Sequence, residues 1–518
     1  MGKPDLRLGV DVGGTNTDAV VLDRADRLLA RAKVPTTTDV TSGITAAVEE
    51  VTASAGDLRD RITHAMLGTT HATNAILQRR GLRRVAVVRI AGPATHAVRP
   101  LFGWPDDLRA AVSAGEAIVP GGIEFDGREL SPFDPDAVAR FLEGVADRAE
   151  GVAITSVFAP VSSRHEDDAE VVVRRELGDV PVSLSHQVGS VGLLERENAT
   201  VLNAALVDVA EEVAQAFRAA LASQGLRPAL FLSQNDGTLM ALGHAARHPV
   251  LTVGSGPANS IRGAAYLTGT SDALVIDVGG TSSDVGVLVR GFPRESSIGV
   301  EIGGVRTNFR MPDLVTIALG GGTIVSEGGP HGVELGPDSV GYRLAREALV
   351  FGGATSTLTD AAVAEGRVDV GDRRATREHR DLLASALRRA DRALAEAVDR
   401  VKVSREEQPL IAVGGGSVLV PDSLPGASEV VRPDHFDVAN AVGAAIASVS
   451  GEVDRIFHLG PGGRQDAIAE ASAEAIERAV EAGAAPGATE VVEVEEIPLT
   501  YLTDPAVRIR LKAAGPLA

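Results

Sequence analysis

The chain has 518 residues, 57 of them glycine and none of them cysteine, and its formal net charge is −20. The lack of cysteine excludes disulfides, iron–sulfur clusters and thiolate zinc sites, and the negative charge argues against nucleic acid or an anionic membrane as a partner. No apolar run approaches the roughly 18 residues of a membrane span and the N-terminus lacks a signal peptide's apolar segment, so we expect a cytoplasmic protein of about two to four domains.

Strand-like and helix-like segments alternate along the chain. The strand-like runs are short and rich in Val, Ile and Leu, and several end at a Gly-bearing turn. This alternation predicts an α/β fold built from layers of sheets and helices. The expected helices cover residues 42–54, 135–148, 199–224, 378–401 and 438–449. The expected strands include residues 84–88, 151–156, 229–232 and 410–413.

Two regions depart from this alternation. Residues 92–133 are rich in Gly, Pro and Asp and have weak periodicity, which predicts an insertion or lid. Residues 456–518 form a tail in which we expect a helix at 465–482 and strands at 489–497 and 507–511. Glutamate and valine alternate in the first of these strands, a pattern that suits either an edge strand for a partner or a solvated hairpin.

One segment of the chain occurs twice. Residues 8–22 read LGVDVGGTNTDAVVL and residues 274–288 read LVIDVGGTSSDVGVL, with identical residues at the two ends and through the DVGGT core. Each copy has an apolar strand, a Gly-Gly turn and a second apolar strand, which predicts a β-hairpin. An aspartate ends each first strand, at Asp11 and Asp277, and another begins each second strand, at Asp18 and Asp284. The repeat predicts two similar domains.

Four more Gly-bearing turns follow apolar runs, at residues 67–70, 253–257, 319–323 and 413–417. Glycine lets backbone N–H groups approach an anion closely, and Thr and Ser hydroxyls add donors. The chain has no P-loop motif. We therefore expect a polyphosphate to be held by backbone amides and a divalent cation, with Asp11 and Asp277 as the carboxylates nearest the cation. For any single one of these turns, a plain tight connection is the simpler explanation of the sequence.

The paired DVGGT hairpins resemble the phosphate-1 and phosphate-2 loops of the sugar kinase, Hsp70 and actin superfamily. That resemblance implies two ribonuclease-H-like domains around an ATP cleft, with residues 11–18 as phosphate 1 and residues 277–284 as phosphate 2. It further implies that residues 410–417 form the adenosine motif, and that the helices at 198–206 and 438–447 form the hinge elements.

A narrower resemblance is to the A-type, ATP-dependent subunit of the hydantoinase/oxoprolinase family, in a short form. The segments that carry it include LGTTHATNAILQRRG (67–81), SHQVGSVGLLERENATVLNAAL (185–206), FLSQNDGTLM (231–240), VGSGPANSIRGAA (253–265) and ANAVGAA (439–445). The implied domains are residues 1–197 with an insertion at about 92–133, residues 198–455, and a small α+β tail at 456–518. One departure is Val315, which stands where many longer members have a histidine before the Gly-Gly-Gly turn.

The resemblance implies an ATP- and Mg²⁺-dependent amidohydrolase subunit. It would phosphorylate the carbonyl oxygen of a cyclic amide, such as a hydantoin, oxoproline or lactam, and so prepare the ring for hydrolysis. The implied catalytic residues are Asp11, Asp18, Asp277 and Thr70, with Asp11 and Asp277 on the metal. The implied nucleotide-binding residues are Gly13, Gly14, Thr15, Asn16, Thr17, Gly279, Gly280, Thr281, Ser282, Ser283, Gly320, Gly321, Gly322, Gly414, Gly415 and Gly416. The implied substrate residues are Gly68, Thr69, Thr70, His71 and Asn74, although Thr70 also suits a helix N-cap.

Two other functions fit the superfamily resemblance, a small-molecule kinase that retains its phosphorylated product and a regulatory ATPase that acts on a partner. The family resemblance implies a B-type partner subunit or a homo-oligomer. His244 and His248 have the spacing of two ligands on one helix face, but Pro249 ends that helix and no third ligand is evident, so we do not expect a metal there.

Overall fold

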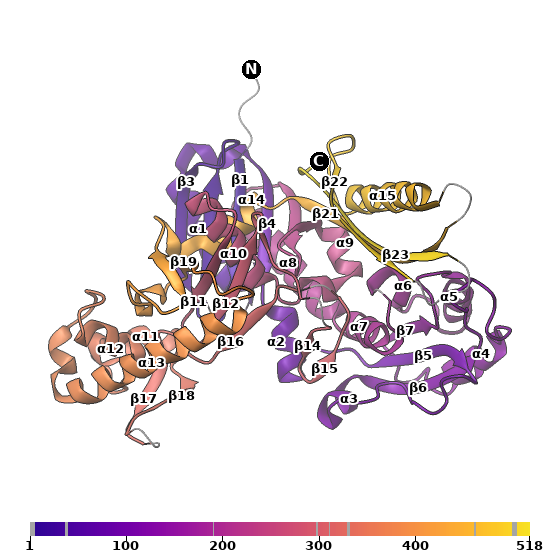
Figure 1. Cartoon of the computed structure of the whole chain (residues 1–518), viewed down its shortest axis with the longest axis horizontal. Coiled ribbons are helices and arrows are strands. Elements are labelled where there is room, and N and C mark those ends of the chain that lie inside the picture. The colour runs from indigo at the N-terminus through magenta and orange to yellow at the C-terminus, as the bar shows by residue number, and fades with distance from the viewer. Residues whose placement is uncertain are drawn as a thin grey trace.

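The computed structural model describes residues 6–36, 40–189, 191–296, 299–309, 311–328, 332–459, 463–499 and 505–518. The described chain folds into three larger sheets, with helices between and around them (Figure 1). The α/β architecture expected from the alternating pattern is therefore present. No helix in the described part of the chain is long and apolar enough to cross a membrane.

The first sheet has nine strands drawn from both ends of the chain. Their order is β22 (Glu490–Pro498), β23 (Ala506–Gly515), β21 (Val449–His458), β10 (Leu239–Ala241), β9 (Ala229–Ser233), β4 (Ile62–Thr69), β1 (Leu6–Val12), β2 (Asn16–Leu22) and β3 (Leu28–Pro35). The tail expected to stand alone thus continues this sheet, and β22 is its edge strand. Strands on both sides of residues 197/198 and 455/456 share one hydrogen-bonded sheet.

The second sheet repeats the pattern of β1, β2 and β4. The hairpin of β11 (Ala273–Val278) and β12 (Ser283–Val289) is antiparallel, and β11 runs parallel to β19 (Gln408–Val413), as β1 runs parallel to β4. The remaining strands of this sheet are β13 (Phe292–Pro293), β16 (Leu314–Ile317) and β20 (Ala427–Val431). Two small antiparallel pairs lie outside it: β14 (Glu301–Ile302) with β15 (Val305–Arg306), and β17 (Thr323–Ser326) with β18 (Glu334–Ser339).

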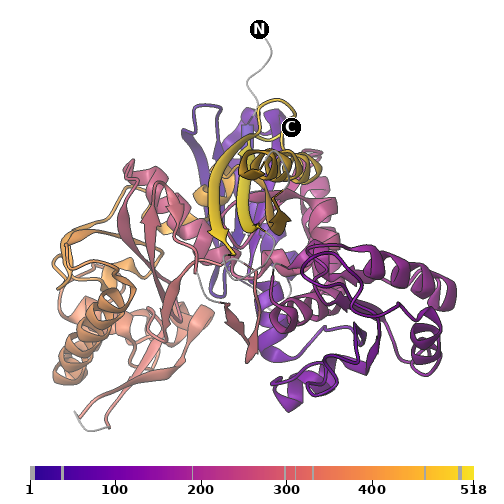
Figure 2. The ribbon, with the colours of Figure 1, turned by 45° about the vertical axis from the view of Figure 1, so that its right-hand side comes forward.

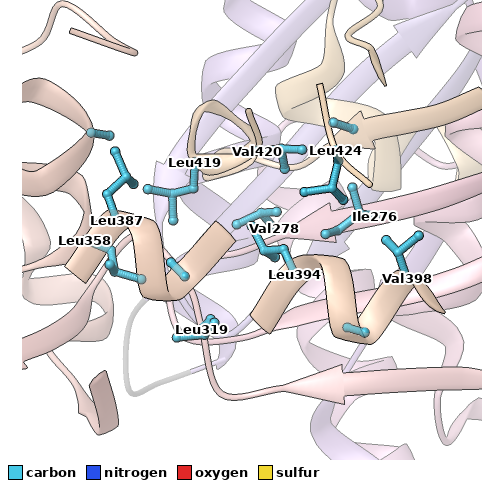
Figure 3. Packing of buried hydrophobic residues seen from close by; sticks show 14 of the residues in the cluster. Ile276, Val278, Leu319, Leu358, Leu387, Leu394, Val398, Leu419, Val420 and Leu424 are labelled. Atoms are coloured by element: carbon cyan, nitrogen blue, oxygen red, sulfur yellow. The ribbon is translucent and has the colours of Figure 1, made fainter. Parts of the chain in front are cut away.

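Both faces of the second sheet are buried. Ile276 and Val278 pack against α13 (Arg380–Val401) and α12 (Leu358–Ala364), as Figure 3 shows. Val275, which points to the other face, packs with Ile261 of α10 (Ser255–Thr268). Successive side chains of a strand alternate between faces, so a continuous Val/Ile/Leu run is what a doubly covered strand requires.

A third, four-stranded parallel sheet covers residues 85–184, in the order β6 (Ser113–Pro120), β5 (Val85–Gly92), β7 (Gly151–Ser156) and β8 (Val182–Leu184). Its helices include α3 (Asp106–Val112), α4 (Pro135–Glu143) and α5 (Arg164–Leu177). The segment 92–133, expected to be an insertion or lid, contributes α3 and the edge strand β6. Figure 2 shows this sheet and the second sheet on opposite sides of the first.

Helices α10 and α14 (Ala439–Ile446) lie between the first and second sheets. Val442 of α14 packs against Val20 of β2, and α10 packs against β11 and β12. The two helices touch at glycines, because a Cβ on Gly263 or Gly443 would collide with the backbone of the other helix. This close crossing joins the two sheets through one helix pair.

Other helices cover the remaining faces. They are α1 (Val40–Ala55), α2 (His71–Gln78), α6 (Ser185–Val188), α7 (Leu193–Ala205), α8 (Val207–Ser223), α9 (Leu242–Arg247), α11 (Leu344–Glu347) and α15 (Gly463–Glu481). The single helix expected at 199–224 is two helices that meet at Leu206. The expected helix at 438–449 ends at Ile446, because Val449 already belongs to β21.

Candidate functional site

The two repeated hairpins have the same geometry. The turn in the first closes through a bond from Gly13 N to Asn16 O of 3.0 Å, and the turn in the second through Gly279 N to Ser282 O at 2.9 Å. In both hairpins the two aspartates stand directly opposite one another, Asp11 across from Asp18 and Asp277 across from Asp284. The sequence repeat is therefore also a structural repeat.

The two turns approach each other closely at Gly280 and Thr15. A Cβ added to Gly280 would collide with the hydroxyl of Thr15, so only glycine permits this approach. Within the described residues, the amides of Gly14, Thr15, Gly280 and Thr281 have no protein acceptor. Their geometry leaves these turn amides free to donate to a ligand between the two sheets.

Asp11 is buried at the end of β1 and accepts two side-chain amides. Asn259 Nδ2 of α10 lies 3.3 Å from Oδ1, and Asn440 Nδ2 of α14 lies 3.1 Å from Oδ2. Burial, with the charge of Asp18 as the next cause, raises the pKa of Asp11 to about 7. Gly68 of β4 makes room for this arrangement, because a Cβ there would collide with both Asp11 and Asn259. Gly68 thus supports the carboxylate from the neighbouring strand.

Among the described residues, the one cation that contacts these aspartates is Lys33, which binds Asp18. Lys33 Nζ donates to Asp18 Oδ1 at 2.7 Å and also to the carbonyl of Asp437 at 2.8 Å. Burial raises the pKa of Asp18 to about 6, although Lys33 opposes the shift. The ammonium therefore ties the first hairpin to the segment that leads into α14.

The second hairpin holds its aspartates with hydroxyl groups. Ser260 Oγ donates to Asp277 Oδ2 at 2.5 Å, and Thr316 Oγ1 donates to Asp284 Oδ1 at 2.5 Å. Burial raises the pKa of both carboxyls, that of Asp284 to about 6. Thr316 directly follows Val315, the position of the sequence departure.

Two glycine loops clamp the second turn. Gly321 N and Gly322 N donate to the carbonyls of Gly279 and Gly280, at 3.0 and 2.7 Å, and Gly416 N donates to Val278 O at 2.7 Å. Gly320 N donates to Thr323 Oγ1 and Gly414 N to Phe436 O. These amides are therefore engaged within the protein. Gly415 differs from the other glycines of these two loops. A Cβ on Gly415 would lie 3.9 Å from Lys33 Nζ, so this residue faces the site.

Two other expected nucleotide-binding hydroxyls also face inward. Thr17 Oγ1 lies 3.2 Å from Thr36 Oγ1, and Ser283 Oγ donates to Leu319 O at 2.6 Å. Both side chains are buried. Asn16 and Ser282 contribute the carbonyls that close their turns. Because the side chains of Thr17 and Ser283 are buried, they lie beneath the turns rather than on their surface.

The segment from Gly68 to Asn74 lies beside the first turn. Thr70 occupies the N-cap position of α2 but makes no capping bond with its side chain, and its Oγ1 lies 3.4 Å from Val12 O of β1. Thr69 Oγ1 contacts His71 Nδ1 at 2.5 Å, and burial lowers the pKa of His71. Asn74 is exposed, with Nδ2 3.4 Å from Thr70 Oγ1. The segment begins at Gly68, which pairs with Asp11 across β4 and β1.

The arrangement suits a cation and a polyphosphate. Four carboxyls with raised pKa values lie at the paired turns, two of them buried (Asp11 and Asp18) and two half-buried (Asp277 and Asp284). Among the described residues, Lys33 contacts one of them, Asp18. Asp11 and Asp277 are not part of any set of three described carboxylate or imidazole ligands whose atoms lie within 4.8 Å of one another.

The sequence analysis did not single out five residues of this site. They are Lys33, Asn259, Ser260, Thr316 and Asn440. Three of them lie within segments that carried the family resemblance, VGSGPANSIRGAA and ANAVGAA, where the polar residues on apolar helices were a usable signal. Lys33 had no such signal, since one lysine on a strand is unremarkable until the fold brings it to Asp18.

Comparisons with known proteins identify one family, hydantoinase/oxoprolinase. The model of the hydantoinase/oxoprolinase N-terminal region matches residues 7–177, and the hydantoinase/oxoprolinase model matches residues 196–390. The acetophenone carboxylase gamma subunit of Aromatoleum aromaticum is 29% identical over 399 residues, which are 70% of this chain and 53% of that protein. Caprolactamase subunit alpha of Pseudomonas jessenii is 27% identical over 387 residues, 71% of this chain and 55% of that protein.

Solved structures share the fold over nearly the whole chain. The ATP-dependent caprolactamase of Pseudomonas jessenii has a TM-score of 0.77 at 20% identity and covers 99% of this chain and 88% of its own. A nucleotide-free acetone carboxylase chain has a TM-score of 0.72 at 16% identity, with the same coverage. In sequence, this chain spans about half the length of the curated relatives that it matches.

Proposed function

Because the chain belongs to the hydantoinase/oxoprolinase family, we propose that it is an ATP-dependent subunit that phosphorylates the carbonyl oxygen of a small cyclic amide. The observation that carries the proposal is the approach of the two DVGGT turns, Gly280 against Thr15, between two sheets of matching topology. A hydantoin, an oxoproline or a lactam would be the substrate, and ring-opening hydrolysis would follow.

The nucleotide phosphates would lie between the turn amides of the two hairpins. Mg²⁺, when bound, would neutralise phosphate charge and so favour transfer of the γ-phosphoryl group. Asp11 and Asp277 would orient the hydrated cation, and Lys33 with Asp18 would hold the first turn in place. The loops of Gly320–Gly322 and Gly414–Gly416 support the second turn. We propose that they position Gly279 and Gly280 instead of contacting the phosphates directly, as the sequence analysis expected.

The proposed chemical step overcomes the low reactivity of the amide carbonyl. Amide resonance makes the ring carbonyl a poor electrophile. In the proposed step the carbonyl oxygen forms a bond to the γ-phosphorus and the bond between γ-phosphorus and the bridging oxygen breaks, which releases ADP. Water then adds to the carbon, and the ring C–N bond breaks as the nitrogen takes up a proton, which opens the ring and leaves an acyl phosphate. A second water hydrolyses the acyl phosphate to the carboxylate and phosphate. Thr70, which sits beside Val12 and presents its hydroxyl at the cleft edge, would contact the substrate or the transferred phosphoryl group.

A carboxylase-type subunit is the second candidate. The similarity to the acetophenone carboxylase gamma subunit favours it, and a ketone offers a comparable carbonyl oxygen for phosphorylation. The two candidates share the nucleotide site and differ in the acceptor. Bicarbonate would be required for productive turnover of a ketone but not for ring opening of a lactam.

We further propose that a partner subunit completes the enzyme. The relatives named above are subunits, and this chain spans about half of their length. The edge strand β22 is one candidate contact, since β23 is its one partner among the described strands and it exposes Val492 and Val494 at 47% and 44%. A homo-oligomer through the same edge is the alternative.

The detailed domain assignment is also a proposal. The order β3-β2-β1-β4-β9 and the matching hairpin of β11 and β12 beside β19 support two ribonuclease-H-like units around the nucleotide. We propose that these units follow the two sheets rather than contiguous halves of the chain. The first unit would then include residues 229–241 and 449–515 in addition to the N-terminal strands.

The test is phosphate release from Mg²⁺-ATP in the presence of a panel of hydantoins, oxoproline, lactams and ketones, with and without bicarbonate and with co-expressed partner candidates. The proposal expects release that depends on a cyclic amide, together with the ring-opened product. A retained phosphoester would instead support a kinase, and release that ignores every compound would support a regulatory ATPase.

A further inference from the structure

A groove lies between the unit of the third sheet and the C-terminal tail, which are neighbours in Figure 1. It consists of two adjoining cavities of about 290 and 440 Å³, which share the lining residues His186, Gly189, Asp454 and Arg478. The loop after β7 and helix α6 form one wall, and β21 and α15 form the other. The larger volume is in the range of small-molecule sites.

The groove lies at the carboxyl edge of the third sheet. The four strands of this sheet are parallel, and residues 159–163 and helix α6 follow the carboxyl ends of β7 and β8. Ligands of α/β sheets bind at this edge. None of the residues assigned to the nucleotide comes from this sheet, so its carboxyl edge has no role in the site described above.

A buried carboxylate stands at this edge. Glu166 of α5 is fully buried, and each of its two oxygens has two hydrogen-bond partners. Oε1 accepts from Ser156 N at 2.8 Å and from Ser185 Oγ. Oε2 accepts from His186 N at 3.0 Å and lies 2.8 Å from His186 Nδ1. Arg196 Nε donates to Ser185 Oγ at 2.9 Å, so the hydroxyl proton of Ser185 is left for Glu166.

This network fixes the ring of His186. An ionised carboxylate only accepts, so the His186 nitrogen that faces Glu166 carries the proton and Nε2 is the acceptor of the neutral ring. Nε2 has no hydrogen-bond partner among the described residues, and it is not one of their buried polar atoms that lack a partner, so it is accessible. The side chain is 20% exposed and lines both cavities, and Asp167 Oδ1 lies 3.9 Å from Nε2, beyond hydrogen-bond distance. The groove therefore contains an oriented proton acceptor.

The other proton acceptors along the groove are engaged, weak or not oriented. The lining carboxylates that have cationic partners are Asp236, Glu452, Asp454 and Glu474. Burial lowers the pKa of His244 to about 4 and that of His248 to about 3, which makes both rings weak bases. Glu481 of α15 makes no ion pair with a described residue, but no described side chain orients it either. Glu481 is thus the main alternative to His186.

The groove also reaches the segment that precedes α2. Leu67 of β4 pairs with Leu232 of β9, so Gly68–Thr70 and residues 234–235 leave neighbouring parallel strands at one edge of the first sheet. Gln234 and Asn235 line the larger cavity. Neighbouring strands are about 4.8 Å apart. The groove therefore extends from His186 to the neighbourhood of Thr70, the residue proposed to contact the substrate or the transferred phosphoryl group.

We propose that His186 is the proton-transfer residue of the ring-opening step and that Glu166 positions it. This role rests on the proposed function, whereas the oriented imidazole rests on the contacts of Glu166. Nε2 takes a proton from water as the water oxygen bonds to the activated carbon. Nε2 then gives this proton to the ring nitrogen as the C–N bond breaks, so the imidazole returns to its starting state. The remaining hydroxyl proton goes to the released amine, and an acyl phosphate is left.

Ring opening measures this role directly. Native chain with its co-expressed partner candidates is supplied with Mg²⁺-ATP and with hydantoin, 5-oxoproline or ε-caprolactam, and the ring-opened product is quantified. His186→Ala should lower kcat by about 100-fold or more, the size of a proton-transfer contribution, and should leave the KM for ATP nearly unchanged. His379→Ala, which removes an exposed histidine, is the control and should behave as the native chain. His186→Gln, with the same expected loss, replaces His186→Ala if the latter does not fold.

Added base separates proton transfer from a structural role. Imidazole should restore part of the kcat of His186→Ala, whereas pyrazole, a ring of the same size and a much weaker base, should not. Glu166→Gln should lower kcat by at least about tenfold, because the ring loses the carboxylate that fixes its tautomer. A native kcat in His186→Ala, or equal rescue by the two rings, would overturn the proposal. A native kcat in His186→Ala together with a large loss in Glu481→Gln would move the role to α15.

The tautomer of His186 is measured without substrate or nucleotide, by long-range ¹H–¹⁵N correlation NMR of histidine-labelled chain, with His186→Ala for assignment. At about pH 8 we expect the proton on Nδ1, and a proton on Nε2 would contradict the proposal whatever the amides show. If the native chain opens no amide, the proposed function fails and the catalytic role of His186 fails with it. If the native chain opens an amide and His186→Ala opens it at the same rate, the role of His186 fails alone.

Discussion

The hairpin of β1 and β2 and the hairpin of β11 and β12 share a sequence and a turn geometry but not their surroundings. The carbonyls of the second turn receive amides from two glycine loops, at Gly321, Gly322 and Gly416. Among the described residues the first turn has fewer supports: a Cβ on Gly14 would meet no atom within 4 Å, and Thr36 supports the turn through Oγ1 to Gly13 O at 2.8 Å. Within the described residues, the second turn is therefore held by more backbone hydrogen bonds than the first.

Their charges differ as well. In the first hairpin side-chain amides hold Asp11 and an ammonium holds Asp18, whereas in the second hairpin hydroxyls hold both aspartates. Lys33 also binds the carbonyl of Asp437, at the start of the segment that leads to α14. We propose a division of labour on this basis, in which the second hairpin holds phosphate on a well-supported turn and the first hairpin is the more adjustable of the two.

The largest expected effect is on the clamp of the second turn. Gly414 has φ of +84°, and a Cβ there would collide with Asp277 and with the backbone of Val278. Gly414→Ala should lower the free energy of unfolding by about 3 kcal/mol, because strain and collision add. Gly14→Ala in the first turn should change it by no more than about 0.5 kcal/mol. Urea denaturation of both variants checks this, and equal midpoints would remove the distinction between the two turns.

An intermediate effect is expected at Asp18, because Lys33 contacts this carboxylate and no cation contacts Asp284 among the described residues. The fold raises the pKa of Asp18 from 3.8 to about 6, so the folded chain holds this proton more tightly, and Asp18 makes stability fall as pH rises between about 4 and 6. Lys33→Met removes the cation that opposes the shift, so the loss should extend to higher pH. We expect about 2 kcal/mol of destabilisation at pH 8 and less at pH 5.

The matched control is Thr316→Val, which removes a neutral donor from the equivalent Asp284. Its cost should be about 1 kcal/mol and should vary less with pH. Denaturation midpoints at the two pH values, in buffer free of divalent cations, give both numbers. If the two variants have the same pH dependence, Lys33 does not distinguish the hairpins.

The smallest effects are expected when one side-chain hydrogen bond to each turn is removed. Thr36→Val removes the bond to Gly13 O, and Ser339→Ala removes a 3.2 Å bond to Gly280 O. Each should cost about 1 kcal/mol of stability. Among the described residues the first turn has fewer other contacts, so Thr36→Val should raise the KM for ATP by severalfold while Ser339→Ala leaves it nearly unchanged. The opposite order of KM values would mean that the second turn is the adjustable one.

The sequence was informative where one local pattern determines the structure. The DVGGT repeat predicted two hairpins, and both are present with the same closing bond and the same cross-strand aspartate pairs. The apolar runs at 229–232 and 410–413 correctly predicted β9 and β19. These features depend on turn chemistry and on strand-length apolar runs, which lie within a few residues of each other.

Long-range pairing could not be predicted in this way. The strands of the tail, β22 and β23, pair with β21 and extend the first sheet, and residues 85–184 form a sheet of their own. Which strand joins which sheet depends on packing between segments hundreds of residues apart. The contacts of Lys33, Asn259 and Asn440 with the aspartates have the same origin. The roles of all these site residues remain predictions.

The central claim is that the two hairpins form one Mg²⁺-ATP site, and isothermal titration of Mg²⁺-ATP into native chain, Asp11→Asn and Asp277→Asn tests it most directly. Asp466→Asn, an exposed carboxylate on α15, is the control. The account predicts that both hairpin variants lose at least about tenfold in affinity, because each removes a carboxylate that orients the cation, while the control binds normally. Native affinity in both hairpin variants would contradict the account.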